Sequence, residues 1–358
     1  MPAVVSTIDI WFEKLGIAFH DVQKSFSVFG FEVFFYGVVI AVSVLAGLFV
    51  ATRVAKKTGQ DPENYLELVI FCIIFGVIGA RLYYVIFAWD DFKNDLLQVF
   101  NIRGGGLAIY GAVIGGVLTA VVYCRKKKLN TLLVLDTACC GLITGQMLGR
   151  WSNFINMEAF GSYTDGFTAM RLNAAKLTAP MLSGYTGPMI TVDGVDYIQV
   201  HPTFLYESLW SMMVLIVLLI FTKRKKFNGQ IFLMYLIGYG LGRFWIEGLR
   251  TDQLKIGHTS IAVSQVLSGA LVIAGIAVFI VMLRKSKMKA ALTGEAAAAE
   301  EGTVPAAEAA EEATAPAAEA ETATAEPAAD VNPEVTAEPA PKPPAAAPAP
   351  SDNTPPEP

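Results

Sequence analysis

Seven apolar blocks, each about twenty residues long, set what this chain of 358 residues can fold into. A helix that crosses the hydrocarbon core of a bilayer needs about twenty mostly apolar residues. With 54% hydrophobic residues, the chain is also too apolar for a soluble domain. We therefore predict an all-α polytopic membrane protein with seven transmembrane helices, at residues 34–52, 67–88, 105–123, 132–149, 203–222, 229–249 and 261–283.

Basic residues predict how these helices are oriented. Lys and Arg cluster after the odd-numbered blocks, whereas aspartates or longer polar loops follow the even-numbered ones. Short loops rich in Lys and Arg stay in the cytoplasm. The clusters lie at residues 53–57, 125–128, 223–226 and 284–289. We therefore expect the N-terminus outside, the C-terminus in the cytoplasm, and a small extracytoplasmic segment, residues 150–201, between helices four and five.

Composition divides the chain into three parts. Residues 1–33 form an N-terminal extracytoplasmic or interfacial segment, residues 34–284 the transmembrane domain, and residues 285–358 a tail. The stretch 291–358 contains 14 acidic residues and one Lys, and residues 290–358 hold 13 of the 18 prolines. A sequence so rich in Ala, Pro and Glu cannot bury a core, so we predict a disordered cytoplasmic tail.

The four cysteines indicate neither a disulfide framework nor a metal site. Cys72, Cys139 and Cys140 lie inside apolar blocks, and Cys124 adjoins a basic cluster that the charge pattern places in the cytoplasm. No metal-ligand spacing accompanies them, so we interpret them as small packing residues. We expect no metal, no cofactor and no nucleic-acid partner.

Polar side chains at membrane depth lie almost entirely on the outer half of the predicted helices. A guanidinium at that depth costs at least roughly 2.5–3.5 kcal/mol unless an anion or water meets it. On the sixth helix, Tyr239, Arg243, Glu247 and Arg250 are separated by four, four and three residues, which places them on one face. The other members are Arg81, Tyr84, Arg103, Arg150, Asn153, Asn156, Glu158 and His201.

A structural role can explain why any one of these polar residues lies at membrane depth. Arg243 and Glu247, at i and i+4, are spaced to pair with each other, and Arg81 can extend toward the membrane surface. Such roles do not account for the one-sided distribution, whereas an anionic ligand does. Because arginine binds phosphate through two parallel, charge-assisted hydrogen bonds, we expect a phospholipid headgroup in an outward cavity.

Glycines in two helices predict close approaches. Gly238, Gly240 and Gly242 leave the surface beside Arg243 thin enough for a backbone or a ligand, whereas Gly111-x-x-x-Gly115 indicates close helix packing. The sequence has no nucleophile elbow, Ser/His/Asp set, P-loop or metal cluster. A reaction at this site would therefore need its nucleophile from a second substrate.

Four segments resemble the signatures of the prolipoprotein diacylglyceryl transferase family. They lie in the family's order between residues 34 and 284, and the acidic tail lies outside the resemblance. The segments are Gly79-x-Arg81-x-x-Tyr84, Gly149-Arg150-x-x-Asn153-Phe154-Ile155-Asn156-x-Glu158-x-Phe160-Gly161, His201-Pro202-Thr203-x-Leu205-Tyr206-Glu207 and Tyr239-Gly240-x-x-Arg243-x-x-x-Glu247-x-x-Arg250.

The resemblance implies an enzyme of the bacterial cytoplasmic membrane, with the bilayer as its surroundings. Such enzymes move the sn-1,2-diacylglyceryl group from phosphatidylglycerol to the thiol of the lipobox cysteine in a preprolipoprotein. A thioether forms and glycerol 1-phosphate leaves. This chemistry agrees with an outward phosphate site and an externally supplied nucleophile.

Matching positions carry the family's roles onto this chain. Arg150 and Arg243 are expected to hold the phosphate and to stabilise it as it departs, while Glu247 and Arg250 orient Arg243 or line the cleft. Asp136, deeper in the fourth helix, is expected to anchor packing. The remaining substrate-binding candidates are Asn153, Asn156, Glu158, Gly161, Tyr36, Arg81, Tyr84, His201 and Tyr239.

Tyr110 departs from the family pattern, in which many relatives have His. That His is a natural base for the incoming thiol, whereas an unperturbed tyrosine, with a pKa of about 10, is a poor base at neutral pH. Tyr110 is therefore a catalytic candidate that either hydrogen-bonds only or shares the site with another base. The alternatives for the base are Glu158, His201 and Glu247.

Two other functions fit the same residues. Intramembrane arginines and glycine-interrupted helices also suit a transporter or flippase for an anionic lipid or metabolite, although no inverted repeat is evident. The second of these functions is that of a non-catalytic membrane scaffold that works through its tail.

Overall fold

The computed structural model of this protein describes residues 7–102, 105–255 and 262–301. Arg103 and most of the predicted tail therefore lie outside the described residues. Nearly all of these residues belong to one compact unit, Met1–Ala298.

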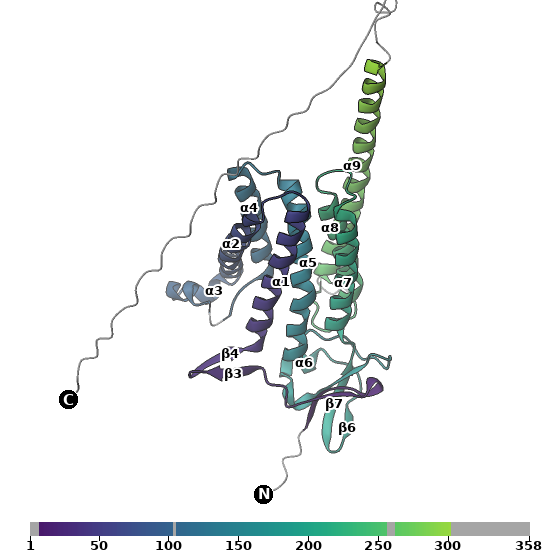
Figure 1. The fold of residues 1–358 in the computed structure, drawn as a ribbon. Coiled ribbons are helices and arrows are strands. Elements are labelled where there is room, and N and C mark those ends of the chain that lie inside the picture. Colours follow the sequence, from purple (N-terminus) through teal and green to yellow (C-terminus); the bar gives the residue numbers. More distant parts are fainter. Residues whose placement is uncertain (1–6, 103–104, 256–261, 302–358) are drawn as a thin grey trace, which may run out of the picture. The chain divides into compact units, whose positions relative to one another are not determined.

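Long helices make up most of the described chain (Figure 1). Among the described residues, six are long and apolar enough to cross a membrane, which supports a multi-pass membrane protein. They are α1 (Phe35–Lys57), α2 (Glu63–Phe87), α4 (Ile109–Lys126), α5 (Thr131–Asn156), α7 (Thr203–Thr222) and the Val263–Lys289 part of α9 (Val263–Glu301).

The sixth predicted span is also a helix, α8 (Gln230–Glu247), but it falls outside this group of six. The polar side chains of Gln230, Arg243 and Glu247 lower its apolar character. α8 packs against α5 and α7 and runs beside α7 in Figure 1. The prediction of seven transmembrane helices is therefore not confirmed. At the C-terminal end, α9 continues past the expected boundary at residue 284.

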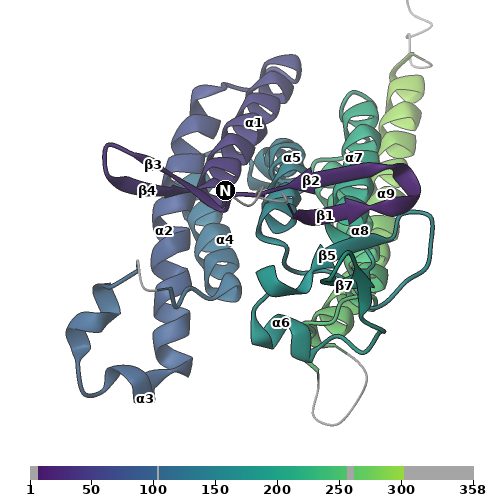
Figure 2. The same cartoon turned by 90° about the horizontal axis from the view of Figure 1, so that it is seen from below.

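Helix α5 occupies the centre of the bundle. It packs against α1, α4, α7 and α8, and α2 packs against α4. Viewed from below, α1, α2 and α4 lie on one side of α5, and α7, α8 and α9 on the other (Figure 2). Cys139 and Cys140 are buried in a core cluster with Val214, Leu218 and Ile231, and all four cysteines are free thiols, as predicted.

Glycines bring two pairs of helices into close contact. A Cβ on Gly111 would collide with the carbonyl oxygen of Gly79, and one on Gly79 would lie 2.5 Å from the carbonyl oxygen of Gly111. The same relation holds between α1 and α5, where a Cβ on Gly47 would lie 2.6 Å from the carbonyl oxygen of Gly141. The predicted packing role of Gly111 is confirmed, since only a hydrogen fits between these backbones.

The glycines of α8 face neighbouring side chains. A Cβ on Gly242 would collide with the indole of Trp210, and one on Gly238 would lie 2.9 Å from Cγ1 of Val214. Trp210 also donates to the carbonyl oxygen of Gly238 at 2.8 Å. The surface predicted to admit a backbone or ligand is thus occupied by α7 at Gly238 and Gly242 and by α9 at Gly240, where a Cβ would lie 2.8 Å from Cγ2 of Val272 and 3.4 Å from the carbonyl oxygen of Ser268.

Asp136 anchors the start of α8. Its Oδ2 accepts from the backbone N–H of Gly229 at 2.9 Å, and its Oδ1 accepts from that of Phe232 at 3.0 Å. Lys225 donates to the same carboxylate at 3.1 Å. The first N–H groups of a helix have no partner within the helix. The buried Asp136 supplies one from α5, which confirms its predicted packing role.

The prediction of an all-α protein is wrong, because one end of the bundle carries β-structure (Figure 1). A five-stranded antiparallel sheet has the order β2-β1-β5-β7-β6. Ile10, Leu172, Ile198 and Val200 lie completely buried beneath it. The strands are β1 (Ile8–Phe12), β2 (Ile17–His20), β5 (Met170–Asn173), β6 (Ile190–Val192) and β7 (Val195–Val200).

This sheet joins two regions that the sequence separates. β1 and β2 come from the predicted segment 1–33, and the other three strands come from the predicted loop 150–201. The two regions share one core cluster, in which Ile10 and Phe12 pack with Met170, Leu172 and Ile198. We call the sheet and residues 159–202 around it the head.

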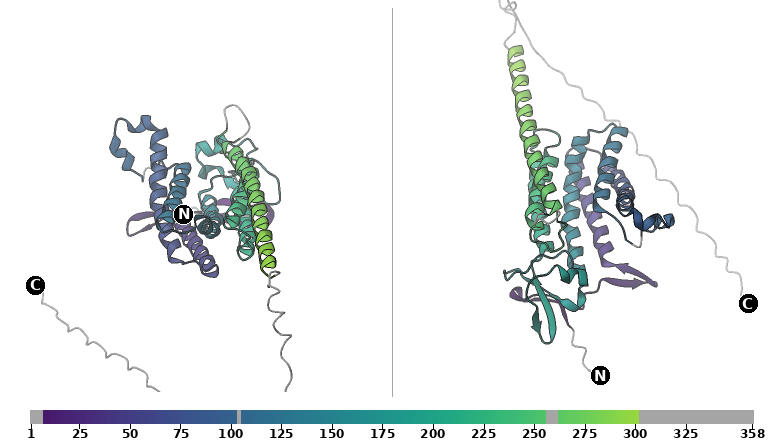
Figure 3. Two further views of the ribbon diagram at one scale, coloured as in Figure 1. Left: turned by 90° about the horizontal axis from the view of Figure 1, so that it is seen from above. Right: turned by 180° about the vertical axis from the view of Figure 1, so that it is seen from behind.

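A second hairpin precedes α1 and extends away from the head (Figure 3). It consists of β3 (Ser25–Val28) and β4 (Phe31–Phe34), which pair Phe26 with Val33 and Val28 with Phe31. Cross-strand partners share a face, so one face is wholly apolar. Phe29 at its tip is 98% exposed, and α1 begins immediately after β4.

Short helices complete the described chain. α3 (Trp89–Phe92) and the 3₁₀ turn η2 (Leu96–Phe100) connect α2 to α4. The head contains η3 (Ala174–Lys176) and α6 (Ala179–Ser183), and η1 (Glu13–Leu15) lies between β1 and β2.

Replacing Gly111 with alanine tests the contact between α2 and α4. We expect Gly111→Ala to lower the free energy of unfolding by on the order of 1–3 kcal/mol, because the new methyl group must push α4 away from Gly79. Gly116→Ala on the same helix is the matched control, since a Cβ there would meet nothing within 4 Å. Thermal unfolding of both variants in detergent makes the comparison, and equal midpoints would contradict the contact.

Candidate active site

The carboxylate of Glu207, near the start of α7, is shared by three arginines. Its Oε2 lies 2.5 Å from Nη2 of Arg150 on α5. Its Oε1 lies 3.4 Å from Nη1 of Arg243 on α8 and 3.6 Å from Nη1 of Arg250, which follows α8. Glu207 is 7% exposed, so these charges meet largely out of water. A buried carboxylate is tolerated only when it is paired in this way.

Two of the three arginines have a second carboxylate of their own. Nη2 of Arg243 lies 2.7 Å from Oε2 of Glu247, the i, i+4 pair that the sequence spacing allows. Arg250 donates from Nε and Nη2 to both oxygens of Asp252, at 2.9 and 2.7 Å. Three guanidinium groups thus face three carboxylates, and the cluster is balanced in charge.

Asp252 owes its charged state to Arg250. Burial alone would raise the pKa of the Asp252 carboxyl, but the hydrogen bonds and the charge of Arg250 more than offset burial, and the pKa is lowered. Arg250 is therefore held in place by an ionised partner at neutral pH.

The segment after α5 turns back toward the cluster. α5 ends at Asn156, and both Met157 and Ala159 adopt left-handed backbone conformations. This turn brings Glu158 against the last turn of its own helix. Oε1 of Glu158 accepts from Nδ2 of Asn153 at 3.0 Å and from Nδ2 of Asn156 at 3.4 Å. The three predicted headgroup residues are therefore together.

Gly161 connects this turn to the ends of α7 and α8. Its N–H donates to the carbonyl oxygen of His201 at 3.0 Å, and Ser162 donates to that of Leu249 at 2.7 Å. A Cβ on Gly161 would lie 2.7 Å from Cβ of His201 and 3.0 Å from the carbonyl oxygen of Leu249. Gly161 is therefore required for close approach of three segments, and it contributes no side chain of its own.

His201 lies beside the cluster in a half-buried position. Its Nδ1 lies 3.2 Å from Oη of Tyr206, and that hydroxyl also lies 2.7 Å from Oγ1 of Thr168. Burial lowers the pKa of His201, because the charged imidazolium loses water. Burial therefore favours the neutral imidazole.

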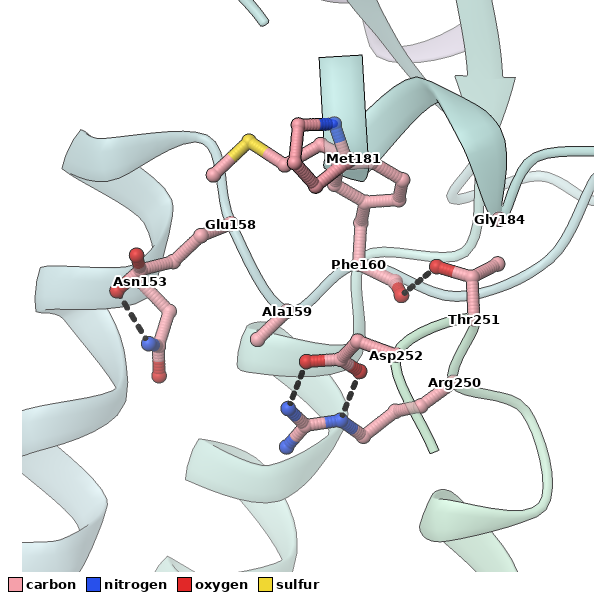
Figure 4. Close-up of a pocket in the computed structure, with 10 residues that line it drawn as sticks. Asn153, Glu158, Ala159, Phe160, Met181, Gly184, Arg250, Thr251 and Asp252 are labelled. Atoms are coloured by element: carbon pink, nitrogen blue, oxygen red, sulfur yellow. Dashed lines mark hydrogen bonds and ion pairs between the residues drawn. The ribbon is translucent and has the colours of Figure 1, made fainter. Parts of the chain in front are cut away.

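A cavity of about 340 Å³ lies between the turn and Arg250. Figure 4 shows the Asn153–Glu158 pair on one side of it and the Arg250–Asp252 pair on the other. Met181 lies against it from α6 of the head. The complete lining is Asn153, Glu158, Ala159, Phe160, Pro180, Met181, Gly184, Arg250, Thr251 and Asp252. Such a lining suits a ligand with hydroxyl groups and a negative charge.

Arg81 is buried in a separate arrangement. Its guanidinium donates to five backbone carbonyl oxygens of the connection between α2 and α4, at 2.6 to 3.1 Å. These belong to Gln98, Val99, Asn101, Gly105 and Gly106. The guanidinium also lies over the rings of Phe92 and Tyr84, at 5.0 and 6.0 Å. All five N–H donors are used to order this connection.

The remaining predicted tyrosines lie on three different helices. Tyr36, at the start of α1, is 44% exposed, and Tyr110, at the start of α4, is 38% exposed beside the ring of Tyr83. Tyr239 stacks on Tyr235 of α8 at 5.7 Å. Within the described ranges, no hydrogen bond or ion pair connects Tyr36, Tyr110 or Arg81 to the cluster around Glu207.

Two residues of the cluster were missing from the predicted site. Glu207 is the only charged residue in α7, and a lone carboxylate in an apolar span is a functional signal in itself. Asp252, two residues after Arg250, lies in a polar loop, and nothing in the sequence distinguishes it from the other polar residues there. In the part of the chain that the structure describes, no group of His, Cys, Asp and Glu side chains could hold a metal ion.

Comparisons with known proteins agree on one family. The family described as prolipoprotein diacylglyceryl transferase matches residues 23–281. A phosphatidylglycerol–prolipoprotein diacylglyceryl transferase of Finegoldia magna is 43% identical over 255 residues, 71% of this chain and 93% of that protein. Proteins with the same name from Clostridioides difficile and Bacillus cytotoxicus are 40% and 39% identical, over 74% and 72% of this chain and 97% and 90% of their own lengths.

Replacing Arg81 with lysine tests its structural role. Lysine keeps the charge but offers a single ammonium group to five carbonyl oxygens. We expect hydrogen exchange of the backbone between α2 and α4 to rise at least tenfold in Arg81→Lys. The control, Arg53→Lys, replaces an exposed arginine of α1. Unchanged exchange in that connection would show that Arg81 does not order it.

Proposed function

We propose, because this chain belongs to the prolipoprotein diacylglyceryl transferase family, that it transfers a diacylglyceryl group from phosphatidylglycerol to a cysteine thiol of a preprolipoprotein. The thiol is that of the lipobox cysteine. Its sulfur bonds to the terminal glyceryl carbon, the bond from that carbon to the phosphate oxygen breaks, and glycerol 1-phosphate leaves with the electron pair. The convergence of three arginines beside a polar cavity is the observation that carries this proposal.

The arginines match the demands of such a leaving group. The phosphate gains negative charge as the carbon–oxygen bond breaks, and positioned guanidinium groups stabilise that charge without having to reorganise. Arg150 and Arg243 are the proposed phosphate ligands, Glu247 orients Arg243, and Arg250 lines the cleft. The ion pairs of Arg243 and Arg250 support this, because they fix each guanidinium before the lipid arrives.

The cavity beside Arg250 is the proposed place of the headgroup glycerol. Asn153, Asn156 and Glu158 carry the hydrogen-bonding atoms that hydroxyl groups need, and they already bond to one another there. Gly161, His201 and Tyr206 lie around the same turn. The substrate-binding roles proposed for Tyr36, Tyr84 and Tyr239 remain predictions, and the contacts of Arg81 support a positioning role for it.

The thiol proton needs an acceptor near this cluster. Burial lowers the pKa of His201 and so favours the neutral imidazole, which is the state that a base requires. Glu158 and Glu247 are the carboxylate alternatives, and Glu247 is engaged with Arg243. Tyr110 lies on α4 with its ring beside Tyr83, and a hydrogen-bonding role suits it better than that of a base.

We also propose the topology that the charge pattern indicates. In this arrangement the head faces outward, the Lys- and Arg-rich ends of α1, α4 and α7 face the cytoplasm, and α8 is the remaining span of a seven-helix transmembrane domain. The exposed apolar face of the β3–β4 hairpin suits an interfacial position next to α1. The location is the bacterial cytoplasmic membrane, and the tail is cytoplasmic. The transporter alternative gains no support from the relatives, which are named as transferases.

Arg243→Lys tests the phosphate site. We expect transfer to fall at least 100-fold, because lysine cannot form two parallel hydrogen bonds to a phosphate. The assay incubates the purified protein with phosphatidylglycerol and a lipobox peptide and detects the thioether product by its mass. Arg53→Lys is the control and should retain full activity. Wild-type rates in the Arg243→Lys variant would remove Arg243 from the mechanism.

Cysteine labelling tests the proposed topology. Asp165→Cys in the head and Lys57→Cys at the end of α1 place exposed thiols at opposite ends of the bundle. A membrane-impermeant maleimide should label the first variant in intact cells and the second only after the membrane is opened. The reverse pattern would place the head in the cytoplasm and overturn the outward site.

A further inference from the structure

We propose that Glu207 is a built-in counter-anion, which holds Arg150 while no lipid is bound and which the lipid phosphate displaces. The proposal rests on the proposed function, because it concerns what the arginines do before and after they bind phosphate. Glu207 acts through Arg150, so it is a positioning residue.

The first support is that the carboxylate lies where an anionic ligand of the arginines would be expected. Glu207 contacts guanidinium groups from α5, from α8 and from the segment after α8. Its own helix, α7, is otherwise uncharged. A side-chain carboxylate and a phosphate present similar pairs of oxygen atoms to a guanidinium, so the two compete for the same donors.

The second support is that the three arginines are not held equally. Arg243 and Arg250 each have another carboxylate at 2.7 Å, from Glu247 and Asp252, and contact Glu207 only at 3.4 and 3.6 Å. Arg150 lies 2.5 Å from Glu207, and within the described residues this is its only ion pair. Displacing Glu207 therefore releases Arg150 and leaves the other two arginines fixed.

The third support is the charge balance of the cluster. Three guanidinium groups and three carboxylates sum to zero, so a phosphodiester adds an excess negative charge unless one carboxylate gives way. Glu207 is the one whose two oxygen atoms face all three arginines. It is also the one whose departure keeps Arg243 and Arg250 paired.

A competing carboxylate has a definite effect on the reaction. It weakens the binding of the singly charged lipid and of the glycerol 1-phosphate product. The phosphate in the transition state carries more negative charge than the lipid, so it competes more strongly with the carboxylate for the arginines. Without Glu207, three arginines in a half-buried site would retain the phosphate product. Return of Glu207 to Arg150 therefore promotes product release.

Glu207→Gln removes the charge and keeps the shape. We expect it to lower the KM for phosphatidylglycerol and the inhibition constant of added glycerol 1-phosphate by about tenfold each, and to lower kcat because product release is slow. A merely structural role would raise KM or unfold the protein, and neither would strengthen product binding. An unchanged or higher inhibition constant would overturn the proposal.

Two further variants complete the experiment. Glu247→Gln, in the same cluster, should raise the KM, because it loosens Arg243 and leaves Glu207 on Arg150. Glu207→Asp keeps the charge but shortens its reach, and it should shift both constants in the same direction by a smaller factor. Glu207→Asp replaces Glu207→Gln in the test if the latter does not fold. A shift of the two constants in the opposite direction would overturn the proposal. If the wild-type protein forms no thioether, it is the proposed function that fails instead.

Discussion

The structure depends on neutralising buried charge at one end of a helical bundle. Glu207 sits in a helix that is apolar elsewhere, and such a carboxylate is stable only against cations. Arg150 and Arg243 supply these from α5 and α8, so the three helices must meet at one level. The charges of the arginines are already balanced by carboxylates without a ligand, so the site is assembled before the lipid binds. An arriving phosphate then replaces a carboxylate as partner of the arginines.

Contacts elsewhere in the molecule keep this meeting point fixed. Asp136 ties the far end of α8 to α5, which sets the depth at which Arg243 meets Glu207. Gly161 lets the turn after α5 approach the ends of α7 and α8, where Arg250 leaves the helix. The head closes over this end and contributes Met181 to the cavity (Figure 4). Bundle and head therefore act as one support for the arginines.

The sequence predicted those features that depend on local pattern. The spacing of Arg243 and Glu247 on one helix indicated their ion pair, and the glycines of α4 indicated its packing against α2. The sheet was missed because β1 and β5 are distant in the chain, and their pairing cannot be read from either short segment alone. Glu207 is the last residue of the motif that begins at His201. Its role was missed because its arginine partners lie on other segments, and the periodicity of one helix does not reveal such contacts. Arg81 was assigned to substrate for the same reason, since its five carbonyl partners become close only when the connection folds back.

The central claim is that the guanidinium groups of this cluster bind the phosphate of the lipid donor. Solid-state NMR can measure it directly, as the dipolar coupling between ³¹P of phosphatidylglycerol and ¹⁵N-labelled arginine side chains of the protein in bilayers, with signals assigned by Arg150→Lys and Arg243→Lys. The account predicts nitrogen–phosphorus distances of roughly 4 Å for both residues, as a direct hydrogen bond requires. Each variant should lose the coupling of the arginine it replaces and keep that of the other, and a spectrum that is the same in both variants as in the wild type, or no coupling in the wild type, would contradict it.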